Sequence, residues 1–361
     1  MGKRAFVFNP GPAALPLPVL ERIQLELLDY ASTGTSVLEL SHRSKQFEGI
    51  LNDAVERIKR LLELDERFRV LFLQGGASLQ FSMVPLNLSQ AGKPVGYIDT
   101  GYWASKAIKE AKVLEKEIQV VASSSDRNHT YIPKGFPVDP AISYLHLTSN
   151  NTIRGTQWHT FPDSGKVPLV SDMSSDIFSR RFDTKPFGLI YAGAQKNAGP
   201  AGVTIVIIRE DMLERTPESL PVMLKYPTFV ESNSLYNTPP CFAIYVVGLV
   251  MRWLEEEIGG LQKMEDVNRR KARLLYDYLD SQEFFRSPVE LDSQSWMNVI
   301  FQLPTPELEQ QFIQEVNKAG LIGLKGHRSV GGCRASLYNA VTIEAVETLV
   351  GLMKEFARKN G

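Results

Sequence analysis

The stretch GLIYAGAQKNAGPAGVTIVII, residues 188–208, places a loop of small residues between two short apolar runs. These runs, Gly188–Ala192 and Val203–Ile208, have the length and apolar content of buried β-strands. The loop between them holds Lys196 among alanines and glycines. Because its neighbours are mostly small, this lysine can approach a flat ligand closely. Lys196 is therefore the first candidate for a reactive group.

A third apolar run, Val167–Val170, precedes these two and is followed by Ser171 and Asp172. An aspartate and a lysine at the ends of two strands are what a pyridoxal phosphate site needs. The lysine forms a Schiff base, and the aspartate keeps the pyridinium nitrogen protonated so that the ring can accept electrons. Taken alone the pair is a weak signal, because most lysines beside glycines belong to surface loops.

The composition describes an ordinary globular protein of 361 residues, with 43% hydrophobic and 22% charged side chains. This length favours two domains. The formal net charge of -1 gives no electrostatic reason to expect nucleic acid or an anionic membrane as a partner. The two cysteines, Cys241 and Cys333, form no CxxC pattern, which fits a reducing compartment. We expect no metal site.

The sequence also predicts a cytoplasmic protein without a membrane segment. Residues 1–10 contain only four apolar residues in a row before prolines interrupt them, which is too short for the core of a signal peptide. The longest apolar stretch, Cys241–Met251, stops at Arg252. That is well short of the roughly 20 residues needed to span a bilayer.

Short β-rich runs alternate with helical patterns between residues 69 and 208, after helices expected up to about residue 28 and over 47–64. This alternation predicts an α/β fold with a mostly parallel sheet covered by helices on both faces. The runs are 69–73, 95–98, 144–147, 167–170, 188–192 and 203–208. Residues 122–140 are polar and interrupted by prolines, so they predict a loop.

The C-terminal third has a different pattern, which predicts a smaller α+β domain. An apolar helix to about Trp253 and a long amphipathic helix precede two strands, 297–303 and 333–338. A helix over 307–319 separates the strands, and Thr342 is the expected N-cap of the last helix. We expect a large domain over 16–262 and a small domain formed by 1–15 and 263–361.

Several of the predicted strands end in polar or glycine-rich residues. In open α/β sheets, ligands bind at the carboxyl ends of the strands, so these segments predict one shared site. They are 74–78, 99–103, 148–152, 171–172 and 195–196.

Two of these segments have a specific binding potential. Gln74–Ser78 lies between a strand and a helix expected to begin near Leu79, and free N–H groups at a helix start can bind phosphate. The alternative is a plain tight turn; neither GxGxxG nor GxxxxGK[ST] occurs in the chain. Trp103 can stack on a flat aromatic ligand or can be a core residue.

The tripeptide His-Arg-Ser occurs twice, beginning at His42 and at His327, and Arg334 follows the second copy. An adjacent histidine and arginine combine a titratable donor with a bidentate fork, which suits phosphate or carboxylate. In a nearly neutral protein, such clusters favour a small dianionic substrate. Solvated surface arginines with a capping histidine remain the alternative.

A set of separate motifs spans essentially the whole chain, and in them the chain resembles the phosphoserine aminotransferases, a class-V family of fold-type-I pyridoxal phosphate enzymes. The motifs are Asn9–Ala13, Gly34–Ser36 with Ser41–Arg43, Gly101–Trp103, Ala192–Asn197, Tyr236–Pro240, and Lys325–Arg328 with Gly331–Ser336. The resemblance implies pyridoxal phosphate as cofactor. Lys196 would bind it covalently, Asp172 would pair with its ring nitrogen, Trp103 would stack on the ring, and Thr152 would bond the phenolic oxygen.

The resemblance further implies how the cofactor phosphate is held. The backbone amides of Ala77 and Ser78 would bind it together with Gln195. Asn237 and Thr238 would reach the phosphate of the neighbouring subunit's cofactor, which implies a homodimer with shared sites. Some family members carry an arginine in the glycine-rich stretch that here reads GGASL, residues 75–79, so the exact phosphate donors stay open.

For the substrates, the resemblance implies that Arg334 binds the α-carboxylate. His42, Arg43, His327 and Arg328 would bind the distal phosphate or the glutamate side chain, with His42 and Arg43 contributed by the partner subunit. The implied reaction is a ping-pong amino transfer from L-glutamate to 3-phosphohydroxypyruvate, in serine biosynthesis. A phosphorylated hydroxythreonine of the pyridoxal phosphate route is a further implied substrate.

Other functions on the same fold are a cysteine desulfurase and an alanine–glyoxylate type aminotransferase. A desulfurase needs a cysteine on a mobile loop, whereas Cys333 lies in a predicted strand directly before Arg334, facing the opposite side. The alanine-type enzyme has no use for two His-Arg pairs. A phosphometabolite-binding protein without catalysis is the alternative from another class, and it would not need Lys196 with Asp172.

Overall fold

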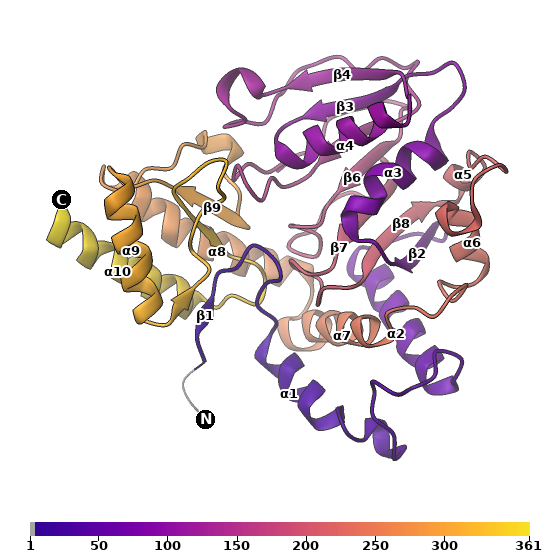
Figure 1. The fold of residues 1–361 in the computed structure, drawn as a ribbon, viewed down its shortest axis with the longest axis horizontal. Helices are drawn as coiled ribbons and strands as arrows, with labels where there is room; N and C mark the ends of the chain where they lie inside the picture. The colour runs from indigo at the N-terminus through magenta and orange to yellow at the C-terminus, as the bar shows by residue number, and fades with distance from the viewer. Residues whose placement is uncertain (1–3) are drawn as a thin grey trace.

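A seven-stranded sheet forms the centre of the computed structural model, which describes residues 4–361 (Figure 1). Residues 1–3, part of the predicted small domain, lie outside the described residues. The strand order is β2-β8-β7-β6-β5-β3-β4. The strands are β2 (Phe68–Leu73), β3 (Val95–Asp99), β4 (Ile118–Ser123), β5 (Leu145–Thr148), β6 (Leu169–Asp172), β7 (Phe187–Gly193) and β8 (Thr204–Arg209).

The prediction of a mostly parallel sheet is confirmed. Strands β7, β6, β5, β3 and β4 pair in parallel, whereas β8 is antiparallel to both of its neighbours, β7 and β2. Because β2 and β7 are both antiparallel to β8, they run in the same direction. The carboxyl ends of β2, β3, β5, β6 and β7 therefore meet at one edge of the sheet.

Two local predictions need correction. The loop predicted over 122–140 begins too early, because Ile118–Ser123 forms the edge strand β4. All of its side chains are half-buried or exposed, so its sequence lacks the continuous apolar run of the inner strands. In addition, Asp172 is the last residue of β6 and does not follow the strand.

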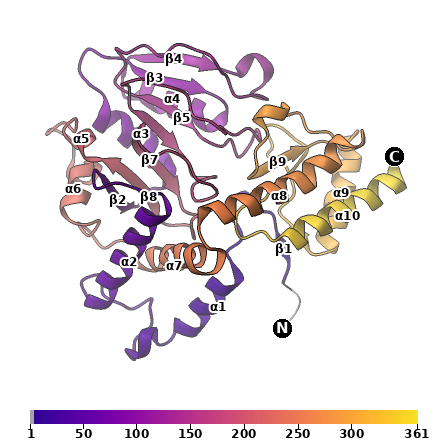
Figure 2. The ribbon, with the colours of Figure 1, turned by 180° about the vertical axis from the view of Figure 1, so that it is seen from behind.

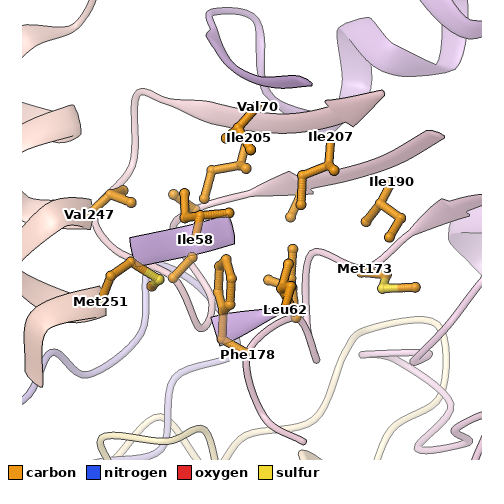
Figure 3. Close-up of a cluster of buried hydrophobic side chains, with 14 of the residues drawn as sticks. Ile58, Leu62, Val70, Met173, Phe178, Ile190, Ile205, Ile207, Val247 and Met251 are labelled. Atoms are coloured by element: carbon orange, nitrogen blue, oxygen red, sulfur yellow. The ribbon is translucent and has the colours of Figure 1, made fainter. Parts of the chain in front are cut away.

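Helices cover both faces of the sheet, as predicted. On one face lie α1 (Leu17–Glu26), α2 (Lys45–Leu61) and α7 (Cys241–Arg252); on the other lie α3 (Gly76–Leu88) and α4 (Tyr102–Val113), with the short helices α5 (Glu210–Leu213) and α6 (Tyr226–Glu231). Successive side chains of β8 point to opposite faces of the sheet. Ile205 and Ile207 pack against α2 and α7, and Val206 packs on the other face. Figure 3 shows Ile205 and Ile207 facing Ile58 of α2.

The C-terminal part has its own hydrophobic cluster, which combines Phe8 with residues between Ala272 and Phe356. Its elements are α8 (Leu261–Asp280), β9 (Asn298–Phe301), α9 (Pro306–Lys318), β10 (Leu321–Ile322), β11 (Cys333–Ser336) and α10 (Ile343–Asn360). Strand β11 pairs antiparallel with β9, and β10 pairs in parallel with β1 (Phe6–Val7) from the N-terminus. Figure 2 shows α8 running from the sheet-containing part toward α9 and α10.

The predicted N-cap of the last helix is confirmed, because the Thr342 side chain accepts a hydrogen bond from the Ala345 N–H. The apolar helix α7 continues into a π-helical turn, Trp253–Ile258, before α8 begins. The division at residue 262 stays a prediction. Within residues 4–361, no helix is long and apolar enough to cross a membrane.

Packing between the sheet and α2 predicts the effect of shortening a side chain there. Ile58 is fully buried, so Ile58→Ala removes packed methyl groups and should cost about 2–5 kcal/mol of stability. Thermal unfolding of the holoprotein should show a midpoint several degrees lower. Val113→Ala is the control, because Val113 is 67% exposed and its truncation should leave the midpoint nearly unchanged. Equal midpoints for both variants would contradict this packing.

Candidate functional site

A pocket of about 310 Å³ opens at the carboxyl edge of the sheet, a volume at the lower end of the usual range for small-molecule sites. Strands β2, β3, β5, β6 and β7 each contribute residues at or just beyond their ends, as the sequence predicted. The N-terminal segment and β11 complete the wall. The lining residues used below are Gly11, Ala77, Ser78, Tyr102, Trp103, Thr152, Ile153, Asp172, Ser174, Gln195, Lys196, His327 and Arg334.

The predicted site residues fall into two groups. Those that line the pocket are Ala77, Ser78, Trp103, Thr152, Asp172, Gln195, Lys196, His327 and Arg334. Those that do not are His42, Arg43, Asn237, Thr238 and Arg328. The second group contains every residue that the family resemblance attributes to a neighbouring subunit.

Lys196 lies in the turn after β7 and lines the pocket. Its Nζ donates a hydrogen bond to Thr152 Oγ1 at 2.6 Å and lies 5.3 Å from the centre of the Trp103 ring. A Cβ at Gly11 would come within 3.1 Å of Lys196 Cγ, so a larger residue there would crowd the lysine. Burial lowers the pKa of Lys196 to about 8, although the Asp172 carboxylate acts in the opposite direction. A larger fraction of the amine is therefore neutral near physiological pH than for an exposed lysine.

Asp172 is almost completely buried, and burial raises the pKa of its carboxyl group. Lys196 and hydrogen bonds from Ser174 oppose that rise. Ser174 donates its N–H at 2.9 Å and its hydroxyl at 2.6 Å, both to Oδ1, so neither bond uses Oδ2. Ser174 was not among the residues predicted from the sequence. Its signal was the Asp-x-Ser spacing after a strand, which is typical of a turn closed by an aspartate side chain.

The turn after β2 begins a helix, as predicted, but α3 starts at Gly76 and not near Leu79. Ala77 and Ser78 thus lie in its first turn, where backbone N–H groups have no acceptor within the helix. Gly75 has a φ of 88°, and a Cβ there would lie 2.6 Å from Leu79 Cδ2, so only glycine fits. This geometry suits the binding of a phosphate.

Arg334 reaches the pocket from β11, and its neighbour Cys333 points into the C-terminal core, as alternation along the strand predicted. Arg334 Nη1 donates to the Thr152 backbone oxygen at 3.2 Å, and its buried Nε has no partner among residues 4–361. The His327 ring lies 5.7 Å from the Tyr102 ring. Burial lowers the pKa of His327, and the positive charges of Arg334, Arg328 and Arg154 lower it further.

A network of buried asparagines connects the lysine loop to the segment after β11, and the sequence analysis gave it no role. Asn197, next to Lys196, accepts a hydrogen bond from the Asn339 N–H at 2.9 Å and donates to the Ile177 oxygen at 2.6 Å. Asn268 of α8 donates to Asn339 Oδ1 at 2.8 Å. The residues that hold Lys196 and those that follow Arg334 are thereby joined.

The remaining predicted residues lie elsewhere. His42 and the exposed Arg43 precede α2, and Arg328 is exposed beside His327. Asn237 Nδ2 donates to Gln74 Oε1 of the same chain at 3.1 Å, just before the α3 turn. No group of three or more His, Cys, Asp or Glu side chains that could hold a metal ion occurs in residues 4–361.

The pocket fits pyridoxal phosphate by the chemistry of its groups. A partly neutral lysine amine is available for a carbonyl carbon, and a buried carboxylate is available for a ring nitrogen. The Trp103 ring offers an apolar face, and the first turn of α3 offers N–H groups to a phosphate. These groups come from different strands and converge on one pocket.

Comparison with known proteins agrees with this chemistry. Residues 5–349 match the family described as aminotransferase class-V. The chain is 65% identical to the phosphoserine aminotransferase of Syntrophobacter fumaroxidans over the full length of both chains. Among solved structures, the phosphoserine aminotransferase of Bacillus circulans subsp. alkalophilus has a TM-score of 0.97 and 52% identity, with complete coverage of both chains. A phosphoserine aminotransferase from Trichomonas vaginalis with bound PLP has a TM-score of 0.93 and 39% identity, covering 97% of this chain and 100% of its own. The chain therefore belongs to the class-V aminotransferase family, and within it to the phosphoserine aminotransferases.

Proposed function

We propose that this chain transfers the amino group of L-glutamate to 3-phosphohydroxypyruvate, giving O-phospho-L-serine and 2-oxoglutarate, with pyridoxal phosphate as cofactor. The observation that carries the proposal is the meeting of the half-buried Lys196 and the buried Asp172 in one pocket, beside Trp103 and the first turn of α3. The names of full-length relatives at 52–65% identity support it.

When bound, pyridoxal phosphate supplies an electron sink that stabilises negative charge at the substrate α-carbon. The Lys196 amine would accept the proton from the substrate α-carbon in one half-reaction and would return a proton to the α-carbon of the new amino acid in the other, and its lowered pKa suits this role. The Asp172 carboxylate, which accepts a hydrogen bond from Ser174, would pair with the ring nitrogen. Gln195 and the N–H groups of Ala77 and Ser78 would hold the cofactor phosphate. Thr152 and Trp103 would orient the ring.

Substrate anions would be bound by the cationic side chains of the pocket. Arg334 would take the α-carboxylate common to all four substrates and products. His327 and Arg328 would take the distal phosphate or γ-carboxylate, together with His42 and Arg43 of a second subunit. Two cationic pairs on one anion explain selection for a phosphorylated substrate.

A homodimer would supply the residues that one chain leaves outside its pocket. Its support is an exposed apolar surface around α1 and the following segment, where Leu25, Leu28 and Leu38 are 75%, 84% and 59% exposed. In Figure 1 this region lies on the outer side of α2 and α7. Asn237 and Thr238 would then contact the partner's cofactor.

We also propose a large domain over 16–262 and a cytoplasmic location. The proposed role is serine biosynthesis, with a phosphorylated hydroxythreonine as a second substrate.

The competing functions have less support. Cys333 is fully buried and burial raises the pKa of its thiol, whereas a desulfurase needs an accessible thiolate. Cys241 lies at the start of α7, outside the pocket, and burial raises its pKa as well. A binding protein without catalysis would not require a half-buried, partly neutral lysine.

Replacing the lysine separates enzyme from binding protein. Lys196→Ala should lower turnover of phosphoserine and 2-oxoglutarate by about 1,000-fold or more, because the variant has neither the covalent link nor the proton carrier. The purified variant should also lack the visible absorbance band of the lysine-bound cofactor. Lys93→Ala, an exposed residue, is the control and should retain both. Unchanged function in Lys196→Ala would leave the binding-protein alternative standing.

The lowered pKa of Lys196 predicts how cofactor uptake depends on pH. Only the neutral amine can attack the cofactor aldehyde, so the rate of incorporation into cofactor-free protein should rise about tenfold per pH unit below about 8 and level off above it. Stopped-flow absorbance measures this rate, and a free lysine analogue corrects for the titration of the cofactor. A rate that keeps rising toward 10.5, the ordinary value for lysine, would mean that the amine is not desolvated.

Mixed dimers test the shared site. Lys196→Ala and Arg43→Ala subunits should each be poorly active alone at low phosphoserine concentration. If Arg43 acts in the partner's pocket, mixed dimers contain one intact site, and random association should restore about a quarter of wild-type activity. If each chain uses its own Arg43, mixing restores nothing. Co-expression with two affinity tags isolates the mixed dimer for the assay.

A further inference from the structure

Arg154 has no assigned role, although it immediately follows two residues of the pocket wall, Thr152 and Ile153. Its side chain is half-buried. Within residues 4–361, it forms no ion pair with an acidic side chain, and its guanidinium donates no hydrogen bond. A half-buried guanidinium without a protein partner has donors available for an anion.

The backbone around Arg154 is fixed by a tight turn. The N–H groups of Arg154 and Gly155 both donate to the Asn151 oxygen, at 3.2 and 2.8 Å. Gly155 has a φ of 76°, and a Cβ there would lie 2.7 Å from Ile300 Cγ1, so the turn is packed directly against β9. The position of the Arg154 Cα relative to the pocket wall is thus well determined.

The Arg154 stem packs beside Gly101, where a Cβ would lie 3.5 Å from Arg154 Cγ. Gly101 directly precedes Tyr102 and Trp103, which line the pocket. Tyr102 in turn contacts the His327 ring. The Arg154 stem therefore lies beside the residue that precedes α4, and the first residue of α4 contacts His327.

The charge of Arg154 acts on the same end of the pocket. It contributes to the lowered pKa of His327, after burial and the charges of Arg334 and Arg328. It also lowers the pKa of His129, where the Asp99 carboxylate has the opposite effect. Three arginines and no acidic group act on the pKa of His327, so a bound anion would balance their charge.

We propose that Arg154 binds the distal anion of the substrate, together with His327, as a cation of this chain's own subsite for phosphate or γ-carboxylate. This inference rests on the proposed amino-transfer function and adds a residue to its specificity. A guanidinium has a planar fork of donors, so it can bind two phosphate oxygens at once while the imidazole binds the third. Neither the α-carboxylate nor the cofactor requires it.

The test compares phosphoserine with serine in the holoenzyme. Single-turnover absorbance at increasing substrate concentration gives an apparent Kd and a limiting rate for each. In Arg154→Gln, the apparent Kd for O-phospho-L-serine should rise about 10- to 100-fold, as expected for the loss of charge-assisted hydrogen bonds. The limiting rate and the apparent Kd for L-serine should stay within about twofold. Arg154→Lys, which keeps the charge without the fork, should lie in between. Arg273→Gln, an exposed arginine on α8, is the matched control.

A second readout does not depend on turnover. Inorganic phosphate should raise the thermal midpoint of the wild-type and Arg273→Gln holoenzymes, because it binds the folded state, and should raise that of Arg154→Gln much less. If Arg154→Gln does not fold, Arg154→Lys takes its place in both measurements. An unchanged Kd for phosphoserine, or equal losses for phosphoserine and serine, would overturn the role of Arg154. A wild-type protein without phosphoserine turnover would overturn the proposed function instead.

Discussion

Removal of two opposite charges from water, the Asp172 carboxylate and the Lys196 ammonium, is the constraint on which this site depends. Burial moves both groups toward their neutral forms, and their mutual attraction opposes that shift. The protein maintains the balance with short-range contacts: Ser174 stabilises the carboxylate, and Thr152 accepts a hydrogen bond from the amine. These contacts favour the charged form of Asp172 against the effect of burial, while the Lys196 amine exchanges protons near neutral pH.

Packing at the edge of the sheet makes that burial possible. Because β8 runs against its neighbours, the ends of β2, β3, β5, β6 and β7 all point toward the same pocket. Small residues then allow close approach: Gly11 contacts the stem of Lys196, and Gly75 permits the turn into α3. The chemistry of the pocket therefore follows from strand direction and from the absence of side chains at a few positions.

The sequence predicted the features that have a local signal. Apolar runs identified six strands, and the polar residues at their ends identified the pocket, because strand topology brings such ends together. Strand β4 was missed since an edge strand needs no apolar face. Long-range hydrogen bonds were missed for another reason: Asn197 and Asn339 are paired across 142 positions, and no spacing rule connects them. The positions of Arg43 and Asn237 outside the pocket likewise have no local signal.

The pocket uses residues from Pro10 to Arg334, nearly the whole length of the chain. No nascent fragment that lacks β11 contains a complete site, however well its sheet has formed. Contacts of such high sequence separation form late, since loop closure must precede them. A ligand that binds only the finished pocket then shifts the folding equilibrium toward the complete chain. During synthesis, the cofactor would thus stabilise the folded protein only after β11 has packed against the rest of the chain.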